Sequence, residues 1–502
     1  MPDDDLAKLL SLPAKPSEQV CASDPRAHYV SPLAERNASP EMQWLFSPRC
    51  KIGLWRRLWL ALAMGERDLG LAISEEQIRA MQAALDPTDD DIDRAHDYER
   101  ELRHDVMAHV HAFGDAAPAA AGIIHLGATS QFINCNAEAV IHREALDLVC
   151  CKLAGLVLAL ADFAKTWRGL PCLAMTHLQP AQPTTLGKRA SVWAYDLSLC
   201  LSRLERTRND LRLRGVKGAT GAQASFLALF DGDGVKVDAL DTYIIKQMGF
   251  SAGRAHVVTG QTYPRVVDAH LLSELASTAA CVHKLATDLR ILCSRKEVDE
   301  PFGDKQIGSS AMPYKRNPMR CERATGLARF VMSLAQNAYD TAATQWLERT
   351  LDDSANRRLS IPESFLATDA ILDLMRSVAA GLDVHEAMVR TNLEQELPFL
   401  ASENLLMAAA RLGRDRQQAH EVIRQAAQQA ARKVKEEGVK CDLIERLRGE
   451  SMFQGVDFNE ALDPSSFVGL APQQVDRFLR EVAEPIRGRY KGRVPALNAP
   501  SV

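Results

Sequence analysis

The chain lacks the features that mark several large classes of protein. Its longest apolar run, in residues 153–164, is shorter than the roughly 20 residues that a membrane-spanning helix needs. Acidic and basic residues nearly balance at a formal net charge of −5, so no basic field exists to attract nucleic acid. The 11 cysteines follow neither metal-site spacing nor a compact disulfide framework. These absences argue against a membrane protein, a nucleic-acid-binding protein and a disulfide-stapled domain.

The start of the chain, MPDDDLAKLL, is acidic and lacks the basic segment and apolar core of a signal peptide. Scattered cysteines are typical of reduced, mostly buried thiols. A hydrophobic fraction of 46% and a charged fraction of 25% are those of a globular protein, and 502 residues indicate two to four domains. We therefore expect a cytoplasmic protein that binds neither membrane nor nucleic acid.

Helical periodicity dominates the sequence, whereas alternating β-branched runs are almost absent. Stretches of 25 to 30 residues exceed the average globular helix, which favours a long bundle. Residues 266–291 are apolar around much of the helix, which predicts packing on both sides and subunit association. We expect an all-α protein with an N-terminal helical domain (1–129), a central long-helix bundle (130–384) and a C-terminal helical domain (385–502). The predicted bundle helices are 140–168, 189–213, 265–296, 319–345 and 364–382.

Residues 308–318, GSSAMPYKRNP, form the most informative segment of the chain. Gly308 permits backbone angles closed to other residues, and Pro313 and Pro318 prevent a regular helix. The segment is therefore predicted to be a loop rich in hydroxyls, backbone N–H groups and positive charge. Such a loop suits a site where a carboxylate gains negative charge during a reaction.

This loop resembles the signature loop of the fumarase/aspartase superfamily, and its Tyr-Lys-Arg version is similar to that of the longer, animal-like adenylosuccinate lyases. The resemblance extends from about residue 29 to about residue 488. It implies a three-domain fold with a central long-helix bundle, and a homotetramer with active sites shared between subunits. The other matching segments, in order, are RHDVMAHVHAFG (103–114), IIHLGATS (123–130), THLQPAQPTTLGKR (176–189), RGVKGATGAQASF (214–226), TGQTY (259–263), ERTLDDSANRR (348–358) and LDPSSFVG (462–469).

The activity that the resemblance implies is a cofactor-free elimination of fumarate in purine nucleotide biosynthesis. The implied substrates are adenylosuccinate, which gives AMP, and succinylaminoimidazole carboxamide ribotide, which gives the free carboxamide ribotide. Two alternatives stay open: another fumarate-releasing lyase, such as one acting on argininosuccinate or hydrating fumarate, and a catalytically silent helical scaffold. Neither alternative accounts readily for the chain holding both residues that suit a phosphate and a complete set of catalytic residues, which are named in the next paragraphs.

Such an elimination needs a base beside a carboxylate, an acid for the departing nitrogen and a cation for the developing charge. The matched motifs assign Ser309 as the base and Lys315 as the cation, although a serine that only caps a turn is the alternative reading. They assign His177 as the acid, because histidine exchanges a proton near neutral pH. They also place His104 in the active site, where it supports the acid and the substrate.

A metal site in the segment that holds His104, His109 and His111 is not expected. On a helix the first and last of these share a face but lie about 10 Å apart along the axis, and His109 points elsewhere. Neither spacing matches a zinc pair at i, i+4. We therefore expect no metal, and we interpret His109 and His111 as packing residues.

The phosphate of a nucleotide calls for arginines and helix-terminal N–H groups. The segment ERTLDDSANRR meets this demand if Asp352, Asp353 and Ser354 cap a helix that starts near Ala355. One departure from the family is Asn37 in ERNASPEM, where the family has a tyrosine. By resemblance the phosphate ligands are Arg349, Ser354 and Arg358 with Arg36 from another subunit; the succinyl carboxylates meet Thr129, Ser130, Thr176, Gln261 and Asn317; and the nucleotide is lined by Arg103, Asp105 and Arg323.

Overall fold

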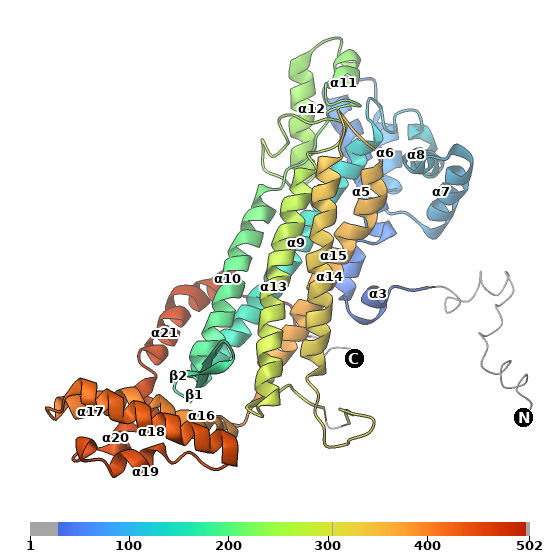
Figure 1. Cartoon of the computed structure of the whole chain (residues 1–502). Helices are drawn as coiled ribbons and strands as arrows, with labels where there is room; N and C mark the ends of the chain where they lie inside the picture. Colours follow the sequence, from blue (N-terminus) through green and yellow to red (C-terminus); the bar gives the residue numbers. More distant parts are fainter. Residues whose placement is uncertain (1–28, 304, 498–502) are drawn as a thin grey trace, which may run out of the picture.

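The computed structural model describes residues 29–303 and 305–497, and within these ranges five helices of 25 to 37 residues run side by side as a bundle (Figure 1). The prediction of an all-α protein with a long-helix bundle is confirmed. Residues such as Leu153, Leu160 and Leu285 are almost completely buried in the large hydrophobic core between these helices. The five helices are α9 (Ser130–Thr166), α10 (Leu186–Asp210), α13 (Val266–Ser294), α14 (Met319–Ala343) and α15 (Asp352–Ala380).

Two bundle helices begin about ten residues earlier than the periodicity predicted. The first turns of α9 and α15 carry polar residues that face a cavity rather than the apolar core, so they do not follow the apolar pattern. Pro362 lies inside α15, where sequence reasoning expects a break. Packing along both sides of α15 keeps the helix continuous despite the missing N–H group.

The N-terminal helices form a second hydrophobic core around Trp55, Trp59, Phe113 and Phe132. Residues 216–244, which the sequence prediction assigned to the central part, also pack into this core. The helices of this region are α5 (Pro48–Asp68), α6 (Glu75–Ala83), α7 (Asp89–Leu102), α8 (Asp105–Ala116), α11 (Ala224–Leu229) and α12 (Gly234–Gln247), with a short 3-10 turn at Pro118–Ala120. The first two helices, α3 (Pro32–Arg36) and α4 (Pro40–Leu45), pack instead on the core of the bundle through Leu33 and Met42.

The C-terminal helices divide between two places. One group forms a small third core, and the last helices return to the bundle, where Val475, Phe478 and Tyr490 are buried against it. The first group comprises α16 (Glu386–Leu400), α17 (Ser402–Arg411), α18 (Arg416–Glu437), α19 (Leu443–Arg448) and α20 (Phe458–Ala461). The returning group comprises α21 (Ala471–Phe478), a π-helical turn at Leu479–Ala483, and α22 (Glu484–Arg489).

Two short antiparallel pairs of strands interrupt the helical fold. Strands β1 (Pro171–Thr176) and β2 (Gln179–Thr185) form a hairpin in which Thr176 pairs with Gln179. Strands β3 (Val298–Asp299) and β4 (Asp383–Val384) pair over two residues. The sequence gives no strand signal here, because the prolines of the hairpin are unusual inside paired strands.

The direction of the bundle helices separates the matched motifs along the long axis of the bundle. The loop 308–318 precedes α14, and residues 344–354 follow it, so the 25 residues of α14 separate these segments by roughly 36 Å. Figure 1 shows the loop and the β1–β2 hairpin at the lower end of the bundle, and the starts of α9 and α15 toward the upper end. Within one chain these motifs therefore form separate groups.

Glu66, on α5, is completely buried, and neither of its carboxylate oxygens has a hydrogen-bond partner among the residues that the structure describes. Burial raises the pKa of this carboxyl from 4.5 to about 8. Between these two pH values the unfolded chain releases a proton that the folded chain keeps, so the free energy of unfolding falls as the pH rises. We expect Glu66→Gln to stabilise the protein by on the order of 4 kcal/mol at pH 8.

The stabilisation should shrink toward zero near pH 4.5, because both states then hold the proton. Thermal unfolding of both proteins at pH 8 and at pH 5 measures the effect. Equal shifts in the midpoint at the two pH values would contradict an ionisable, solvent-excluded Glu66.

Candidate active site

Three helices begin at one cavity of about 960 Å³ at the upper end of the bundle. Helix α8 begins at Asp105, α9 at Ser130 and α15 at Asp352. The first N–H groups of a helix have no partner within the helix, and the helix dipole makes its N-terminus attractive to anions. Within the described part of the chain, the side chains at the N-caps of α9 and α15 accept no hydrogen bond from these groups. The cavity therefore offers N–H groups and helix dipoles that favour a negatively charged ligand.

His104 is oriented by the start of its own helix. Its Nδ1 accepts a hydrogen bond from the backbone N–H of Met107 at 3.2 Å, which leaves the proton of the neutral ring on Nε2. Nε2 lies 3.5 Å from Ser130 Oγ, at the N-terminus of α9. The ring of His104 and the hydroxyl of Ser130, which come from two different motifs, therefore lie side by side at the cavity.

Gln261 connects the start of α9 to the segment before α15. Its Nε2 donates to Thr129 Oγ1 at 3.5 Å, and its Oε1 accepts from Arg349 Nη1 at 3.2 Å. The backbone of Gly260 lies so close to Glu348 that an added Cβ would sit 2.5 Å from the carbonyl oxygen of Glu348. The TGQTY segment thus needs glycine at this point to bring Gln261 and Arg349 together.

The predicted phosphate site differs from the sequence expectation in one respect. Asp352, Asp353 and Ser354 were expected to cap a helix starting near Ala355, but α15 begins at Asp352 after Leu351. Asp353 is instead buried, where Arg265 Nε donates to its Oδ2 at 2.9 Å. Because this carboxylate pairs with an arginine, it does not cap the helix. The N–H of Ser354 donates to the carbonyl oxygen of Leu351 at 3.0 Å, whereas those of Asp352 and Asp353 have no backbone acceptor among the described residues.

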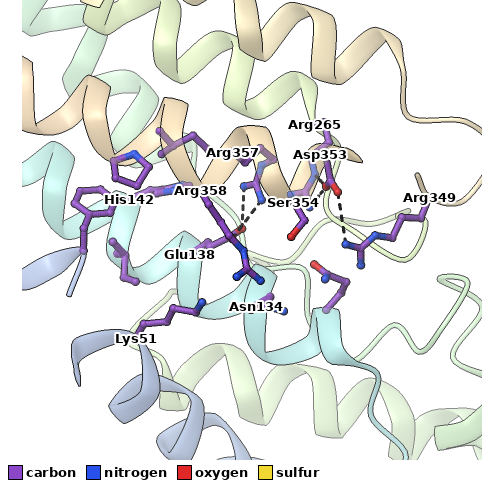
Figure 2. Close-up of a pocket in the computed structure, with 15 residues that line it drawn as sticks. Lys51, Asn134, Glu138, His142, Arg265, Arg349, Asp353, Ser354, Arg357 and Arg358 are labelled. Atoms are coloured by element: carbon purple, nitrogen blue, oxygen red, sulfur yellow. Dashed lines mark hydrogen bonds and ion pairs between the residues drawn. The ribbon is translucent and has the colours of Figure 1, made fainter. Parts of the chain in front are cut away.

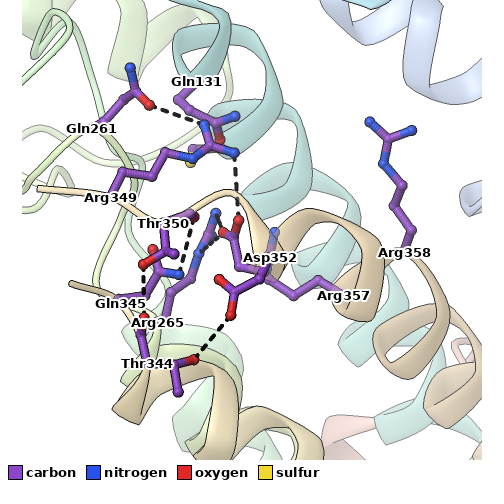
Figure 3. A network of polar contacts seen from close by, with 12 residues as sticks. Gln131, Gln261, Arg265, Thr344, Gln345, Arg349, Thr350, Asp352, Arg357 and Arg358 are labelled. Carbon is purple, nitrogen blue, oxygen red and sulfur yellow. Dashed lines mark hydrogen bonds and ion pairs between the residues drawn. The ribbon is translucent and has the colours of Figure 1, made fainter.

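The two arginines of the predicted phosphate site flank Ser354 from opposite sides. Arg349 Nη2 lies 3.5 Å from Asp353 Oδ1, as part of the network in Figure 3. Arg358 Nη2 donates to Asp105 Oδ2 at 2.7 Å. Burial raises the pKa of Asp105, but the hydrogen bonds from Arg358 and from the N–H of Val106 leave the pKa below its ordinary value. Asp105 therefore stays ionised and orients Arg358.

A buried ionic network lies beneath this site. Arg357 donates from Nη2 to Glu138 Oε2 at 2.8 Å and from Nε to Asp268 Oδ2 at 2.7 Å. Tyr263 donates to Asp268 Oδ1 at 2.6 Å. Burial opposes these charges, but Arg357 and then Arg265 keep the pKa of both carboxyls below its ordinary value. Because each buried charge has a partner, the network fixes α9, α13 and α15 relative to one another beneath the site.

The signature loop at the lower end is closed by its own polar contacts. Asn317 Nδ2 donates to the carbonyl oxygen of Gly308 at 2.8 Å, and an added Cβ on Gly308 would lie 2.1 Å from the carbonyl oxygen of Lys315. Ser309 Oγ accepts from the N–H groups of Ala311 at 3.4 Å and Met312 at 3.2 Å. The serine therefore caps a turn, and the same two N–H groups would stabilise negative charge on its oxygen.

Arg323 and Arg36 lie nearer to this lower end than to Arg349 and Arg358. The pKa of Arg323 is lowered by burial and then by the positive charge of Arg36, so the two guanidinium groups are neighbours. Asn37 Nδ2 donates to the carbonyl oxygen of Pro32 at 2.8 Å at the end of α3. Asn37, which replaces the family tyrosine, thus holds the end of the short helix that positions Arg36.

Thr176 and His177 lie at the exposed tip of the β1–β2 hairpin. The two turn residues, His177 and Leu178, both have positive φ angles, of 56° and 55°. Such a turn normally favours asparagine and glycine, and each non-glycine residue in it costs about 1–2 kcal/mol. This conformation projects His177 away from the chain's own core, and the side chain of Leu178 is 67% exposed.

The predicted site residues thus form three groups within one chain. The upper group contains Arg103, His104, Asp105, Thr129, Ser130, Gln261, Arg349, Ser354 and Arg358. The loop group contains Ser309, Lys315 and Asn317, with Arg323 at the start of α14 and Arg36 beside it. The hairpin group contains Thr176 and His177. His109 and His111 belong to none of these groups, because their rings pack against Trp55 and Tyr98.

Sequence reasoning missed the polar face of α9 and one lysine of α5. Gln131, Asn134, Glu138 and His142 line a second cavity next to the upper group, together with Lys51 (Figure 2). The spacing of these four residues at i, i+3, i+7 and i+11 places them on one helical face. A polar stripe on an otherwise apolar helix was the signal that would have revealed them.

Two ranges of the chain match known protein families. Residues 60–333 match the family described as Lyase, and residues 398–478 match the family described as adenylosuccinate lyase C-terminus. Adenylosuccinate lyase of Saccharomyces cerevisiae is 50% identical over 90% of this chain and 94% of its own length. The enzyme of that name from Schistosoma mansoni is 46% identical over 92% of this chain and 96% of its own length.

Solved structures show the same architecture. The fumarate lyase of Mesorhizobium sp. BNC1 superposes with a TM-score of 0.75 at 26% identity, covering 88% of this chain and 98% of that one. The 3-carboxy-cis,cis-muconate lactonizing enzyme of Pseudomonas putida gives a TM-score of 0.78 at 25% identity, covering 92% and 99%. The fold and the family match together define a lyase of the fumarase/aspartase class. Within that class, the chain belongs to the adenylosuccinate lyase family.

Proposed function

We propose that this enzyme eliminates fumarate from adenylosuccinate to give AMP, and from succinylaminoimidazole carboxamide ribotide to give the free carboxamide ribotide. The observation that carries the proposal is the upper cavity, where three helix N-termini meet Arg349, Ser354 and Arg358. A nucleotide monophosphate with a succinyl group carries anionic charge at both ends, and this cavity offers donors for such charge. Argininosuccinate and fumarate carry no phosphate and do not account for the arginine–serine–arginine set.

Ser309 is the proposed base. Its oxygen takes the proton from the carbon next to the succinyl carboxylate, and the C–H electrons pass into the carboxylate as an enolate-like charge. Hydrogen bonds from Ala311 and Met312 N–H groups favour the ionised hydroxyl, and Lys315 supplies a positive charge on the same loop. Collapse of the enolate forms the C=C bond of fumarate and breaks the C–N bond.

His177 is the proposed acid, which gives its proton to the departing nitrogen as the C–N bond breaks. Its position at the tip of an exposed hairpin suits a residue that enters a neighbouring subunit's site. The succinyl carboxylates would bind at the start of α9, held by His104 with Ser130 and by Thr129 with Gln261. Thr176 and Asn317 would contribute from the hairpin and the loop, while Arg103, Asp105 and Arg323 line the nucleotide.

The active site is proposed to form only when subunits assemble as a homotetramer. About 36 Å of helix separates the loop from the upper group within one chain, which is too far for a shared substrate. Exposed apolar side chains on two bundle helices, Tyr195 and Leu199 on α10 and Phe330 and Tyr339 on α14, support helix packing between subunits. In such a site, which includes the start of another subunit's α15, Arg36 would approach the phosphate and Arg323 would line the nucleotide.

The purified protein, incubated with adenylosuccinate, should show loss of the ultraviolet absorbance of the succinylated adenine as AMP forms. The carboxamide ribotide substrate should be cleaved as well, whereas argininosuccinate and fumarate should not react. Turnover of argininosuccinate or hydration of fumarate, with adenylosuccinate left intact, would assign the enzyme to another branch of the superfamily.

A further inference from the structure

Lys51 differs from the other cations around the cavity in Figure 2. It projects from the start of α5 toward the space beneath Arg358, and it lines this cavity together with Arg349 and Ser354. Its ammonium lies 4.7 Å from the centre of the Trp55 ring, which fixes the side chain in this direction. Neither the resemblance nor the sequence motifs assign any role to this lysine.

Each arginine that lines the cavity already has a carboxylate within 4.0 Å. These pairs are Arg265 with Asp353, Arg349 with Asp353, Arg357 with Glu138 and Asp268, and Arg358 with Asp105. The four guanidinium charges and the four carboxylate charges therefore cancel. In residues 29–303 and 305–497, Lys51 forms no ion pair within the same distance, so its charge adds to those of the paired arginines and is offset only at longer range by Glu138, Asp105 and Glu99.

We propose that Lys51 is a further substrate-binding residue, whose ammonium pairs with the phosphate monoester of the nucleotide. This inference rests on the proposed function and adds one residue to its phosphate site. Arg349 and Arg358 supply directed N–H groups, which their carboxylate partners hold in place, and the start of α15 supplies backbone N–H groups. Lys51 supplies the net charge that a phosphate dianion needs in a partly closed cavity.

The electrostatic surroundings of the Lys51 ammonium agree with this assignment. Burial and then the positive charge of Arg358 lower the pKa of Lys51, while Glu138 and Asp105 raise it. An ammonium that is desolvated beside another cation gains from a bound anion, because the anion offsets both costs. The same residue would therefore favour phosphorylated over dephosphorylated substrate.

The test compares wild type with Lys51→Met, which keeps the aliphatic stem over Trp55 and removes the charge. The KM for adenylosuccinate should rise about 10- to 100-fold, the range of a charge-assisted hydrogen bond, with kcat changed less than about 3-fold. The KM for succinyladenosine, which lacks the phosphate, should stay close to the wild-type value. Lys51→Arg should recover most of the lost affinity.

Lys236→Met is the matched control, because Lys236 also lies over an aromatic ring, that of Phe230, at 5.8 Å. It lies on α12, away from the cavity, and its removal should leave both KM values unchanged. Calorimetric titration with AMP gives a readout that does not depend on turnover. An unchanged KM for adenylosuccinate and unchanged AMP affinity in Lys51→Met would overturn the inference, whereas an inactive wild type would overturn the proposed function instead.

Discussion

Ser309→Ala should lower the turnover of adenylosuccinate by at least about 10³-fold, the upper part of the range for loss of a general base. The hydroxyl accepts two backbone N–H groups, so its removal eliminates the oxygen that would hold the substrate proton. AMP lacks the succinyl group on which the proposed base acts. The dissociation constant for AMP should therefore change little, as calorimetric titration would show.

The alternative reading of Ser309 as a structural turn cap predicts a different pattern. A cap contributes about 0.5–2 kcal/mol to stability, so its loss would lower the unfolding midpoint and spare part of the activity. Ser310→Ala is the matched control, because Ser310 is the exposed neighbour in the same loop. If Ser309→Ala kept more than a few per cent of wild-type turnover, Ser309 would not be the base.

Much of the fold followed from periodicity, because long apolar helices carry a strong local signal. The ends of α9 and α15 did not follow from it, since their polar first turns face a cavity that only the folded chain creates. The β1–β2 hairpin was also missed. Its turn residues, His177 and Leu178, have no turn propensity, yet both adopt positive φ between the paired residues Thr176 and Gln179.

The site was predictable where motifs carry it and not where it depends on long-range packing. The motifs identified His104, Ser130, Gln261 and Arg349, and the structure brings these four residues to one cavity. Lys51 was missed because the residues that share its cavity lie up to about 300 positions away in the sequence. No local pattern predicts that a lysine in one helix will face an arginine pair in another.

No local pattern in the motifs indicates that they lie at opposite ends of a long bundle. Each motif reads as a loop or a helix start, and proximity was inferred only from the shared resemblance. The rise of α14 shows that Ser309 and Ser354 cannot contact one substrate within one chain. The proposed catalysis by these residues would therefore require that neighbouring subunits complete each other's sites.

Two inactive variants should restore each other's activity when their defects lie in different groups. His104→Ala damages the upper group and Ser309→Ala damages the loop, so each variant alone should be nearly inactive. After the two are mixed, dissociated and reassembled, a site is intact only when its loop comes from the His104→Ala variant and its upper group comes from the Ser309→Ala variant. For random assembly of equal amounts this holds for about one quarter of the sites.

The specific activity of this reassembled mixture is the measurement that tests the account most directly. Sites built from different subunits predict recovery to about one quarter of the wild-type value. Ser309→Ala mixed with Lys315→Ala is the control and should recover nothing, since both residues lie on one loop. If the Ser309→Ala and His104→Ala mixture also stayed inactive, although its tetramers had exchanged subunits, the shared active site would be contradicted.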